Sequence, residues 1–263
     1  MTQEQKAAQF RALHAGAPFV IPNPWDVGSA RVLEALGFKA LATTSSGFSF
    51  TLGRPDGGAT LDELIEHVRA IDSATGLPVS VDLESGRGPE ADDVAAAITK
   101  IAEAGAVGGS IEDWDPQAGI YPLAEAVERL SAGVTAARGL GFPFMLTARA
   151  ENHIRGNPDI EDTIARLQAY ERAGADVLYA PGLRSAEEIR AIQAATSKPI
   201  NVLARPDLTM REITDAGAQR ISVGGALTWT AIEAMARAAE QIRDEGDFSS
   251  LASPARIREW LSE

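Results

Sequence analysis

The sequence predicts an α/β fold of the (β/α)8 type, a TIM barrel built as a single domain. Short β-rich runs alternate with Ala-, Leu-, Glu- and Arg-rich stretches at helical spacing, which indicates parallel strands with helices outside. Eight such units within 263 residues match the size of a TIM barrel. A doubly wound open sheet is the alternative. Such sheets usually have fewer strands, and the segment NPWDVGSA after the first strand lacks their glycine fingerprint.

The eight expected strands are short β-rich runs. In chain order they cover residues 18–24, 40–47, 78–86, 108–114, 144–152, 176–182, 199–206 and 220–225. The stretch 159–174 is typical of the helices, because its apolar residues Ile160, Ile164 and Leu167 recur on one face. Capping boxes mark helix starts and glycines mark helix ends. The boxes are Thr60 with Glu63, Ser185 with Glu188 and Thr209 with Glu212, and the glycines are Gly37, Gly105, Gly141, Gly174 and Gly217.

The chain shows no linker and no low-complexity segment, so residues 1–263 are expected to form one barrel domain. Residues 247–263 are expected to be a C-terminal helical extension. Its amphipathic stretch, SPARIREWL, is expected to pack on the barrel or on a neighbouring subunit.

Composition excludes several classes of protein. The net charge is −13, from 24 basic and 37 acidic residues, and such a surface repels phosphate backbones and anionic lipid. Nucleic-acid and membrane partners are therefore not expected. The absence of cysteine excludes disulfides, zinc–thiolate sites and a cysteine nucleophile. No apolar run reaches the ~18 residues of a membrane span and the N-terminus has no signal-peptide pattern, so a cytoplasmic location is expected.

Four carboxylates follow the strands, where a TIM barrel carries its functional groups. Asp82 and Glu84 lie two residues apart in PVSVDLESGRG and would share one face of a strand. Asp56 and Glu112 reach the same side of the rim from the second and fourth strands. Unpaired carboxylates repel at low dielectric, and a divalent cation is the simplest relief. All-oxygen ligation suits Mg²⁺ or Mn²⁺, with some carboxylates holding metal-bound water.

Groups that bind an anion are expected around the same rim. Ser46 and Gly47 end the second strand before a glycine-rich loop, and their backbone N–H groups can form a small anion nest. Arg149 stands across the barrel mouth and can bind a carboxylate through two parallel hydrogen bonds. Asn201, at the end of the seventh strand, is a further candidate substrate contact. Together with a metal, these groups describe a site for a small carboxylic acid.

Several motifs follow one another on successive strands: TSSGFSF with LGRPDGG, then VDLESGRG, SIEDWD and LTARAEN. As a set they resemble the isocitrate lyase/phosphoenolpyruvate mutase superfamily, over about residues 8–250. The resemblance implies a modified TIM barrel whose eighth helix is exchanged between subunits. It also implies a homo-oligomer, a dimer or more often a tetramer.

The resemblance also implies roles for individual residues. Asp82 would be the direct Mg²⁺ ligand, and Glu84, Asp56 and Glu112 would hold metal-bound water. The backbone amides of Ser46 and Gly47 would bind the substrate carboxylate. The guanidinium of Arg149 would stabilise the enolate.

The chain departs from the pattern of this superfamily at several places, among them residues 115–123, where the basic and amide gating residues of mutase and hydrolase members are not evident. Lyase members carry a catalytic Cys in the loop after the fourth strand, and this chain has none. Mutase and hydrolase members carry Trp where Thr44 stands here. The sixth strand ends in YAPG, where several relatives have Glu or His. Tyr121 and Tyr179 are candidates for the missing proton donor.

The expected function is that of a Mg²⁺-dependent lyase. It would cleave a carbon–carbon bond next to a carboxylate in a small 2-oxo or 2-hydroxy acid, through a metal-stabilised enolate. Oxaloacetate decarboxylation asks least of the protein, since CO₂ leaves without a base. Isocitrate- or methylisocitrate-type cleavage needs both a base and an acid. The alternatives are carbon–phosphorus chemistry on phosphonopyruvate and a non-catalytic barrel that binds a keto acid.

Overall fold

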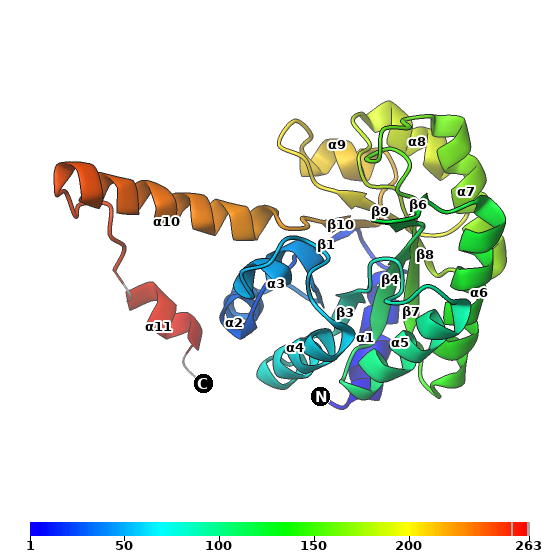
Figure 1. The fold of residues 1–263 in the computed structure, drawn as a ribbon, viewed down its shortest axis with the longest axis horizontal. Helices are drawn as coiled ribbons and strands as arrows, with labels where there is room; N and C mark the ends of the chain where they lie inside the picture. The colour runs from blue at the N-terminus through cyan, green and yellow to red at the C-terminus, as the bar shows by residue number, and fades with distance from the viewer. Residues whose placement is uncertain (254, 262–263) are drawn as a thin grey trace.

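The computed structural model describes residues 1–253 and 255–261, and it forms a barrel of parallel strands surrounded by helices (Figure 1). The barrel strands are β1 (Phe19–Ile21), β2 (Leu41–Ala42), β3 (Val79–Asp82), β4 (Gly108–Glu112), β7 (Met145–Arg149), β8 (Val177–Tyr179), β9 (Ile200–Leu203) and β10 (Arg220–Ser222). Their order is β1-β10-β9-β8-β7-β4-β3-β2. The backbone N–H of Ala42 donates to the carbonyl of Pro22 at 3.1 Å, which joins the two ends of the sheet. The predicted TIM barrel is confirmed.

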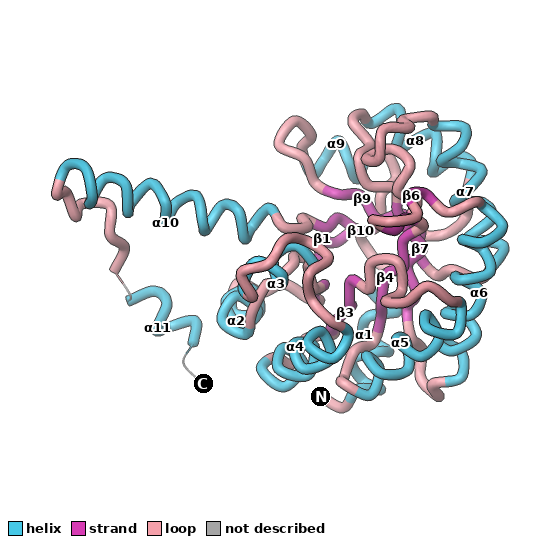
Figure 2. Tube along the Cα trace, in the orientation of Figure 1, coloured by secondary structure: helices cyan, strands magenta, loops and turns pink. Residues whose placement is uncertain are grey.

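The helices lie outside the strands (Figure 2). They are α1 (Gln3–Leu13), α2 (Val27–Ala35), α3 (Ser45–Thr51), α4 (Leu61–Ala74), α5 (Ala91–Glu103), α6 (Leu123–Gly139), α7 (Ile160–Ala173), α8 (Ala186–Ala195), α9 (Met210–Asp215), α10 (Ala226–Glu245) and α11 (Ala255–Leu261). Helix α1 closes the N-terminal end of the barrel, where Phe10 is buried against Phe19, Met145 and Val177. Functional groups are therefore left to the opposite, C-terminal end of the strands.

The local signals for helix boundaries are confirmed. Thr60, Ser185 and Thr209 each accept a hydrogen bond from the amide three residues later, as their capping boxes predict. The five glycines expected at helix ends adopt left-handed φ angles, which a residue with a Cβ rarely tolerates. They are Gly37, Gly105, Gly141, Gly174 and Gly217.

The expected strand over residues 40–47 is wrong from Ser45 onward. Strand β2 ends at Ala42, and helix α3 begins at Ser45 with Thr44 as its N-cap. The hydroxyl of Thr44 accepts a hydrogen bond from the amide of Gly47 at 3.3 Å. A Thr in this position stabilises a helix start, and a helix of seven residues is too short to leave a periodic pattern in the sequence.

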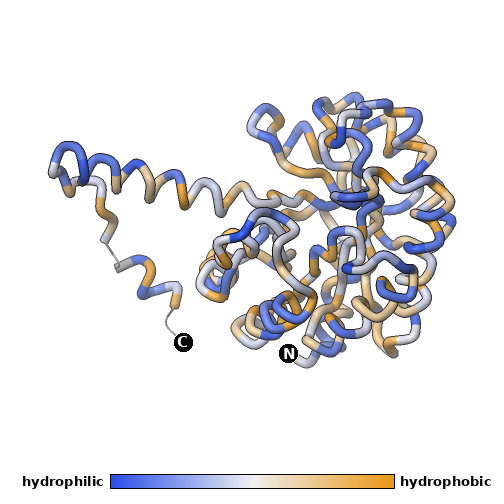
Figure 3. Tube along the Cα trace, in the orientation of Figure 1, coloured by the Kyte–Doolittle hydropathy of each residue, from blue (hydrophilic) through white to orange (hydrophobic). Residues whose placement is uncertain are grey.

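Helix α10 projects away from the barrel instead of packing along it (Figure 1). Of its described residues, Thr228 alone is buried, whereas Trp229 and Met235 are 44% and 60% exposed. Figure 3 shows polar and apolar residues interspersed along the helix. Helix α11 turns back to contact α2, and residues 254 and 262–263 of the expected C-terminal extension lie outside the described residues. Within the described chain, no helix combines the length and apolar character needed to cross a membrane.

Candidate active site

Two adjoining cavities open at the C-terminal ends of the strands. The outer cavity, of about 790 Å³, is bordered by Asp56, Glu84, Glu112 and Arg149. The inner cavity, of about 70 Å³, is bordered by Asp82 and Arg149, among others. Arg149 contributes to both walls, so the side chains predicted from separate strands do converge on one region.

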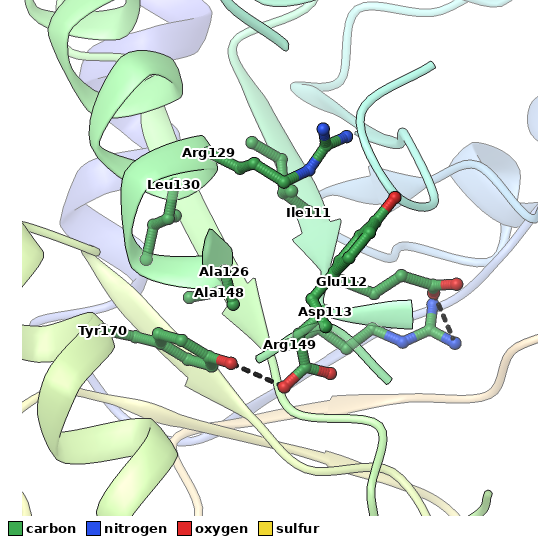
Figure 4. Close-up of a pocket in the computed structure, with 10 residues that line it drawn as sticks. Ile111, Glu112, Asp113, Ala126, Arg129, Leu130, Ala148, Arg149 and Tyr170 are labelled. Atoms are coloured by element: carbon green, nitrogen blue, oxygen red, sulfur yellow. Dashed lines mark hydrogen bonds and ion pairs between the residues drawn. The ribbon is translucent and has the colours of Figure 1, made fainter. Parts of the chain in front are cut away.

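Arg149 ends β7 and lies among carboxylates (Figure 4). Its Nη2 is 3.0 Å from Oε2 of Glu112, its Nε is 2.5 Å from Oε1 of Glu151, and its Nη1 is 3.5 Å from Oδ1 of Asp82. Burial by itself lowers the pKa of Arg149, but the surrounding carboxylates outweigh burial and raise that pKa well above its usual value. The guanidinium is therefore a fixed positive charge, held in one orientation from two sides.

Asp82 ends β3, and the contacts of its carboxylate are long. Its Oδ1 accepts from the amide of Glu84 at 3.3 Å and from the hydroxyl of Ser110 at 3.4 Å, and its Oδ2 accepts from the amide of Ser45 at 3.4 Å. Protein N–H···O bonds centre near 2.9–3.0 Å and O–H···O bonds near 2.7–2.8 Å. The carboxylate thus retains lone pairs that a cation can use.

The spacing of two residues predicts that Glu84 shares a strand face with Asp82, but in the structure it does not. Strand β3 ends at Asp82, and Glu84 adopts a left-handed φ of 52°, so strand alternation no longer applies there. The two carboxylates nevertheless lie close in space. The pKa of Glu84 is raised to about 7, and burial is the largest cause. The charge of Arg87 opposes this shift, and the charges of Asp82 and Asp56 add to it.

Glu112 ends β4 and is 5% exposed. Burial raises its pKa well above the usual value; Arg149 opposes this shift, and the charges of Glu151, Asp82 and Glu84 reinforce it. This crowding of acidic groups is the physical signature of a site that accepts further positive charge.

The residues present fit a hydrated dication better than a fully protein-bound one. Among the described residues, no group of three or more Asp, Glu or His side chains is close enough to form a metal cage. Mg²⁺ commonly uses one or two carboxylates and keeps several waters. Asp82, with its long contacts, can supply a direct ligand, and the carboxylates of Glu84 and Glu112 border the adjoining outer cavity.

Ser46 and Gly47 lie in the first turn of α3, not at a strand end. The amide of Gly47 already donates to Thr44. A Cβ at Gly47 would lie 2.6 Å from Oγ1 of Thr228 and 3.0 Å from Cβ of Trp25, so close packing by itself requires glycine here. The assignment of these amides to the substrate carboxylate stays a prediction.

Asn201 lies deeper than expected, inside the barrel. It is 1% exposed; its Nδ2 donates to Ser222 at 3.0 Å and its Oδ1 accepts from Nε of Arg220 at 2.9 Å. Its amide is therefore engaged with neighbouring side chains. Asn201 borders the inner cavity and does not reach the rim.

Two residues to which the sequence assigned no role support the site, and of the two Arg155 borders the outer cavity. Glu151 is fully buried and holds Arg149. Nη2 of Arg155 is 3.0 Å from Oε2 of Glu151, and its guanidinium stacks on Trp114, 3.4 Å from the ring centroid. The i, i+4 spacing of Glu151 and Arg155 could have predicted their ion pair if these residues formed a helical turn. The sequence after the fifth strand reads as a loop, so no helical turn was expected there.

The candidate proton donors also border the site. Tyr179 lines the inner cavity, with the guanidinium of Arg149 5.4 Å from its ring centroid, and burial raises its pKa to about 12. Tyr121 lines the outer cavity beside the antiparallel hairpin β5 (Trp114–Asp115) and β6 (Gly119–Ile120). Both phenols therefore carry their proton at neutral pH.

The chain is similar to several known proteins. A family model described as phosphoenolpyruvate phosphomutase matches residues 10–243. An oxaloacetate decarboxylase of Rhodopseudomonas palustris is 33% identical over 241 residues, which cover 85% of this chain and 79% of that protein.

Solved structures show the same fold. A protein of Burkholderia cenocepacia J2315, provisionally described as a lyase/mutase, has 48% identity and a TM-score of 0.95 over 99% of this chain and 97% of its own. An oxaloacetate acetylhydrolase with bound oxalate has 27% identity and a TM-score of 0.89 over 99% of this chain and 94% of its own. A phosphonopyruvate hydrolase with oxalate and Mg²⁺ has 24% identity and a TM-score of 0.85 over 99% of this chain and 95% of its own. The chain belongs to the isocitrate lyase/phosphoenolpyruvate mutase superfamily, of which it is a member without cysteine.

Proposed function

We propose that this protein is a Mg²⁺-dependent carbon–carbon lyase acting on a small 2-oxo or 2-hydroxy acid, with oxaloacetate decarboxylation as its first candidate reaction. The observation that supports this most is the pairing of Arg149 with Glu112 and Glu151 directly beside the weakly engaged Asp82. This pairing gives a rigid cation next to a carboxylate that is free to bind a metal. The similarity to oxaloacetate decarboxylases supports the substrate class.

The mechanism follows from these residues. Asp82 would hold Mg²⁺, and Glu84 and Glu112 would orient its water; when bound, the metal supplies positive charge against the 2-oxo acid. Arg149 binds a substrate carboxylate and, as the C3–C4 bond breaks and CO₂ leaves, stabilises the negative charge that develops on the C2 oxygen. A proton added at C3 then yields pyruvate. The hairpin β5–β6 borders the outer cavity.

Decarboxylation is preferred to retro-aldol cleavage because it needs fewer groups from the protein. Retro-aldol cleavage requires a base for the hydroxyl proton and an acid for the product carbanion, and the lyase Cys is absent. Tyr121 and Tyr179 are the candidate acids if that reaction is the true one.

The first test measures pyruvate release from oxaloacetate with a coupled lactate dehydrogenase assay. We expect the protein with Mg²⁺ to exceed the rate of Mg²⁺ alone, and Asp82→Ala to fall to that background because the direct ligand is lost. The exposed Asp215, which pairs with Arg211 on the surface, gives the matched control Asp215→Ala, and this variant should keep full activity. A wild-type rate equal to the Mg²⁺ background would contradict the proposal.

A second candidate function is carbon–phosphorus chemistry on phosphonopyruvate, because the matching family model is that of a phosphomutase. Turnover of phosphonopyruvate, isocitrate or 2-methylisocitrate in place of oxaloacetate would decide between the candidate reactions. Mg²⁺-dependent binding of oxalate without turnover of any of these acids would indicate a non-catalytic keto-acid-binding barrel.

We further propose that α10 packs on a neighbouring copy, in a homo-oligomer. This 20-residue helix has one buried residue and presents Trp229 and Met235 largely to solvent, although Trp229 keeps an edge contact with Phe50 of its own chain. Sedimentation equilibrium should give a dimer or tetramer, and Met235→Asp should shift it toward smaller species. A monomeric wild-type protein would contradict helix exchange.

A further inference from the structure

The inner cavity has many polar side chains in its wall, which is unusual for the centre of a TIM barrel. Such barrels are normally filled by layers of bulky branched side chains. Here Ile21, Ala42 and Val81 share the wall with Asp82, Arg149 and Tyr179 and with further polar side chains. Among these are Thr43, Ser80, Ser110, Asn201, Ser222 and Arg220.

Arg220 is the charged group at the base of this cavity, and it is 5% exposed. Its Nε donates to Asn201 at 2.9 Å, its Nη2 donates to Oγ1 of Thr147 at 2.9 Å, and its Nη1 is 3.3 Å from Nε2 of His14. Burial, together with the charge of Arg220, lowers the pKa of His14 to about 3, so that imidazole is neutral. All three side chains that hold the guanidinium are therefore uncharged.

No acidic side chain of the described residues lies within ion-pair distance of Arg220, in contrast to the other arginine of the cavity. Arg149 has Glu112, Glu151 and Asp82. Burying an ion without a counter-charge is strongly unfavourable. Burial lowers the pKa of Arg220 only to about 10, so it still carries its charge at neutral pH.

Arg220 also has hydrogen-bonding capacity to spare. A guanidinium has five N–H donors, and the contacts above use three of them. The cavity holds about 70 Å³, whereas one buried water needs only about 10–15 Å³. The space therefore accommodates a small anion together with water, beside an uncompensated cation.

We propose that this inner cavity is an anion-binding site in which Arg220 and the surrounding hydroxyls hold one small monovalent anion of the size of chloride or a carboxylate group. Asn201 and Thr147 position the guanidinium, and the anion supplies the charge that the barrel interior lacks. Arg220 lies in the same cavity that Asp82 borders, but the existence of the anion site does not require the proposed reaction.

The same carboxylate-sized anion has two sources: a free ion from solution, or a carboxylate of the substrate reaching past Arg149. A substrate carboxylate bound at Arg220 would make this residue a determinant of specificity for dicarboxylic acids. For a decarboxylase, the carboxylate bound there cannot be the one that departs as CO₂, because holding it would stabilise the ground state rather than the transition state.

The test uses the full-length protein in gluconate buffer at fixed ionic strength, with gluconate replaced stepwise by chloride or by formate. We expect a saturable increase in Tm, of about 3 °C at ten times the dissociation constant. Arg220→Met, which keeps an unbranched apolar stem without the charge, should show no saturable increase, and Arg220→Lys should retain one. Crystals soaked in bromide should show an anomalous peak in the inner cavity of the wild-type protein.

The source of the anion is decided by the kinetics of the wild-type protein with its turned-over acid, or by oxalate binding if none is turned over. Competition by formate would identify a substrate carboxylate as the occupant; formate that binds together with the acid would identify a free anion. A wild-type protein with neither saturable stabilisation by small anions nor a bromide peak in the cavity would overturn the proposal, whatever its catalytic activity.

Discussion

Replacing Arg149 by methionine is expected to lower kcat/KM for the proposed reaction by about 10³-fold. The guanidinium is the group that meets the charge developing on the C2 oxygen, and loss of one such donor typically costs 10²–10³-fold. Arg149→Lys should recover part of the rate only, because an ammonium keeps the charge but not the planar fork that binds a carboxylate at two points. Steady-state kinetics on folded protein measures both.

The same substitution should also destabilise the fold, by about 3–5 kcal/mol, because Glu112 and Glu151 would be left buried without their partner. The pKa of Glu112 is already raised, and it would rise further in the variant. A raised carboxyl pKa favours folding below the unfolded-state value, near 4.3, and this advantage is lost as pH rises through the folded-state pKa. Urea unfolding should therefore show a small deficit near pH 4.5 and the full deficit at pH 8.

A matched double variant separates the two effects. Arg149→Met combined with Glu112→Gln should regain part of the stability, since one buried charge is removed, but it should regain no activity. Full activity in Arg149→Met would mean that the guanidinium is a structural counter-ion for the glutamates and does not act on the substrate.

The parts of the fold that sequence could predict depend on neighbours in the chain. Capping at Thr60 or Ser185 involves residues three positions apart, and a left-handed glycine such as Gly174 ends a helix through its own backbone. The eight strands likewise follow from short apolar runs. These signals were enough to identify the barrel and therefore the rim at which the functional groups gather.

The errors arose where the backbone leaves regular structure. Residue alternation predicted a shared face for Asp82 and Glu84, but it holds only within a strand, and the φ of 52° at Glu84 ends that regularity. The N-cap at Thr44 turned an expected strand end into a helix. The residues after β2 and β3 still lie at the C-terminal end of the barrel. The order of strands in the barrel determines this position, and the local backbone conformation does not change it.

The inner cavity could not be predicted from sequence because its contacts are long-range. Arg220 contacts Thr147, 73 residues away, and His14, 206 residues away. An arginine at the start of a strand is ordinarily a solvated residue at the edge of a sheet. Only closure of the barrel places this one inside, below Arg149.

Replacing Asp113 by alanine is expected to destabilise the protein by about 3–5 kcal/mol, although this residue lines neither the outer nor the inner cavity. Asp113 is 3% exposed and accepts from the hydroxyl of Tyr170 at 2.5 Å (Figure 4), from Nη1 of Arg166 at 3.0 Å and from the amide of Glu151 at 2.8 Å. Its removal leaves Arg166 without a buried counter-charge and Glu151 without the anchor of its backbone.

Urea unfolding measures the loss, with Tyr170→Phe as the matched control. That variant removes a single hydrogen bond to Asp113 and should cost about 1–2 kcal/mol. Because the amide of Glu151 is anchored by Asp113, and Glu151 in turn holds Arg149, the folded fraction of Asp113→Ala should show a lower kcat with a smaller change in KM. If Asp113→Ala is no less stable than Tyr170→Phe, the acidic group contributes only one hydrogen bond, and the orientation of Arg149 must be set by Glu112 instead.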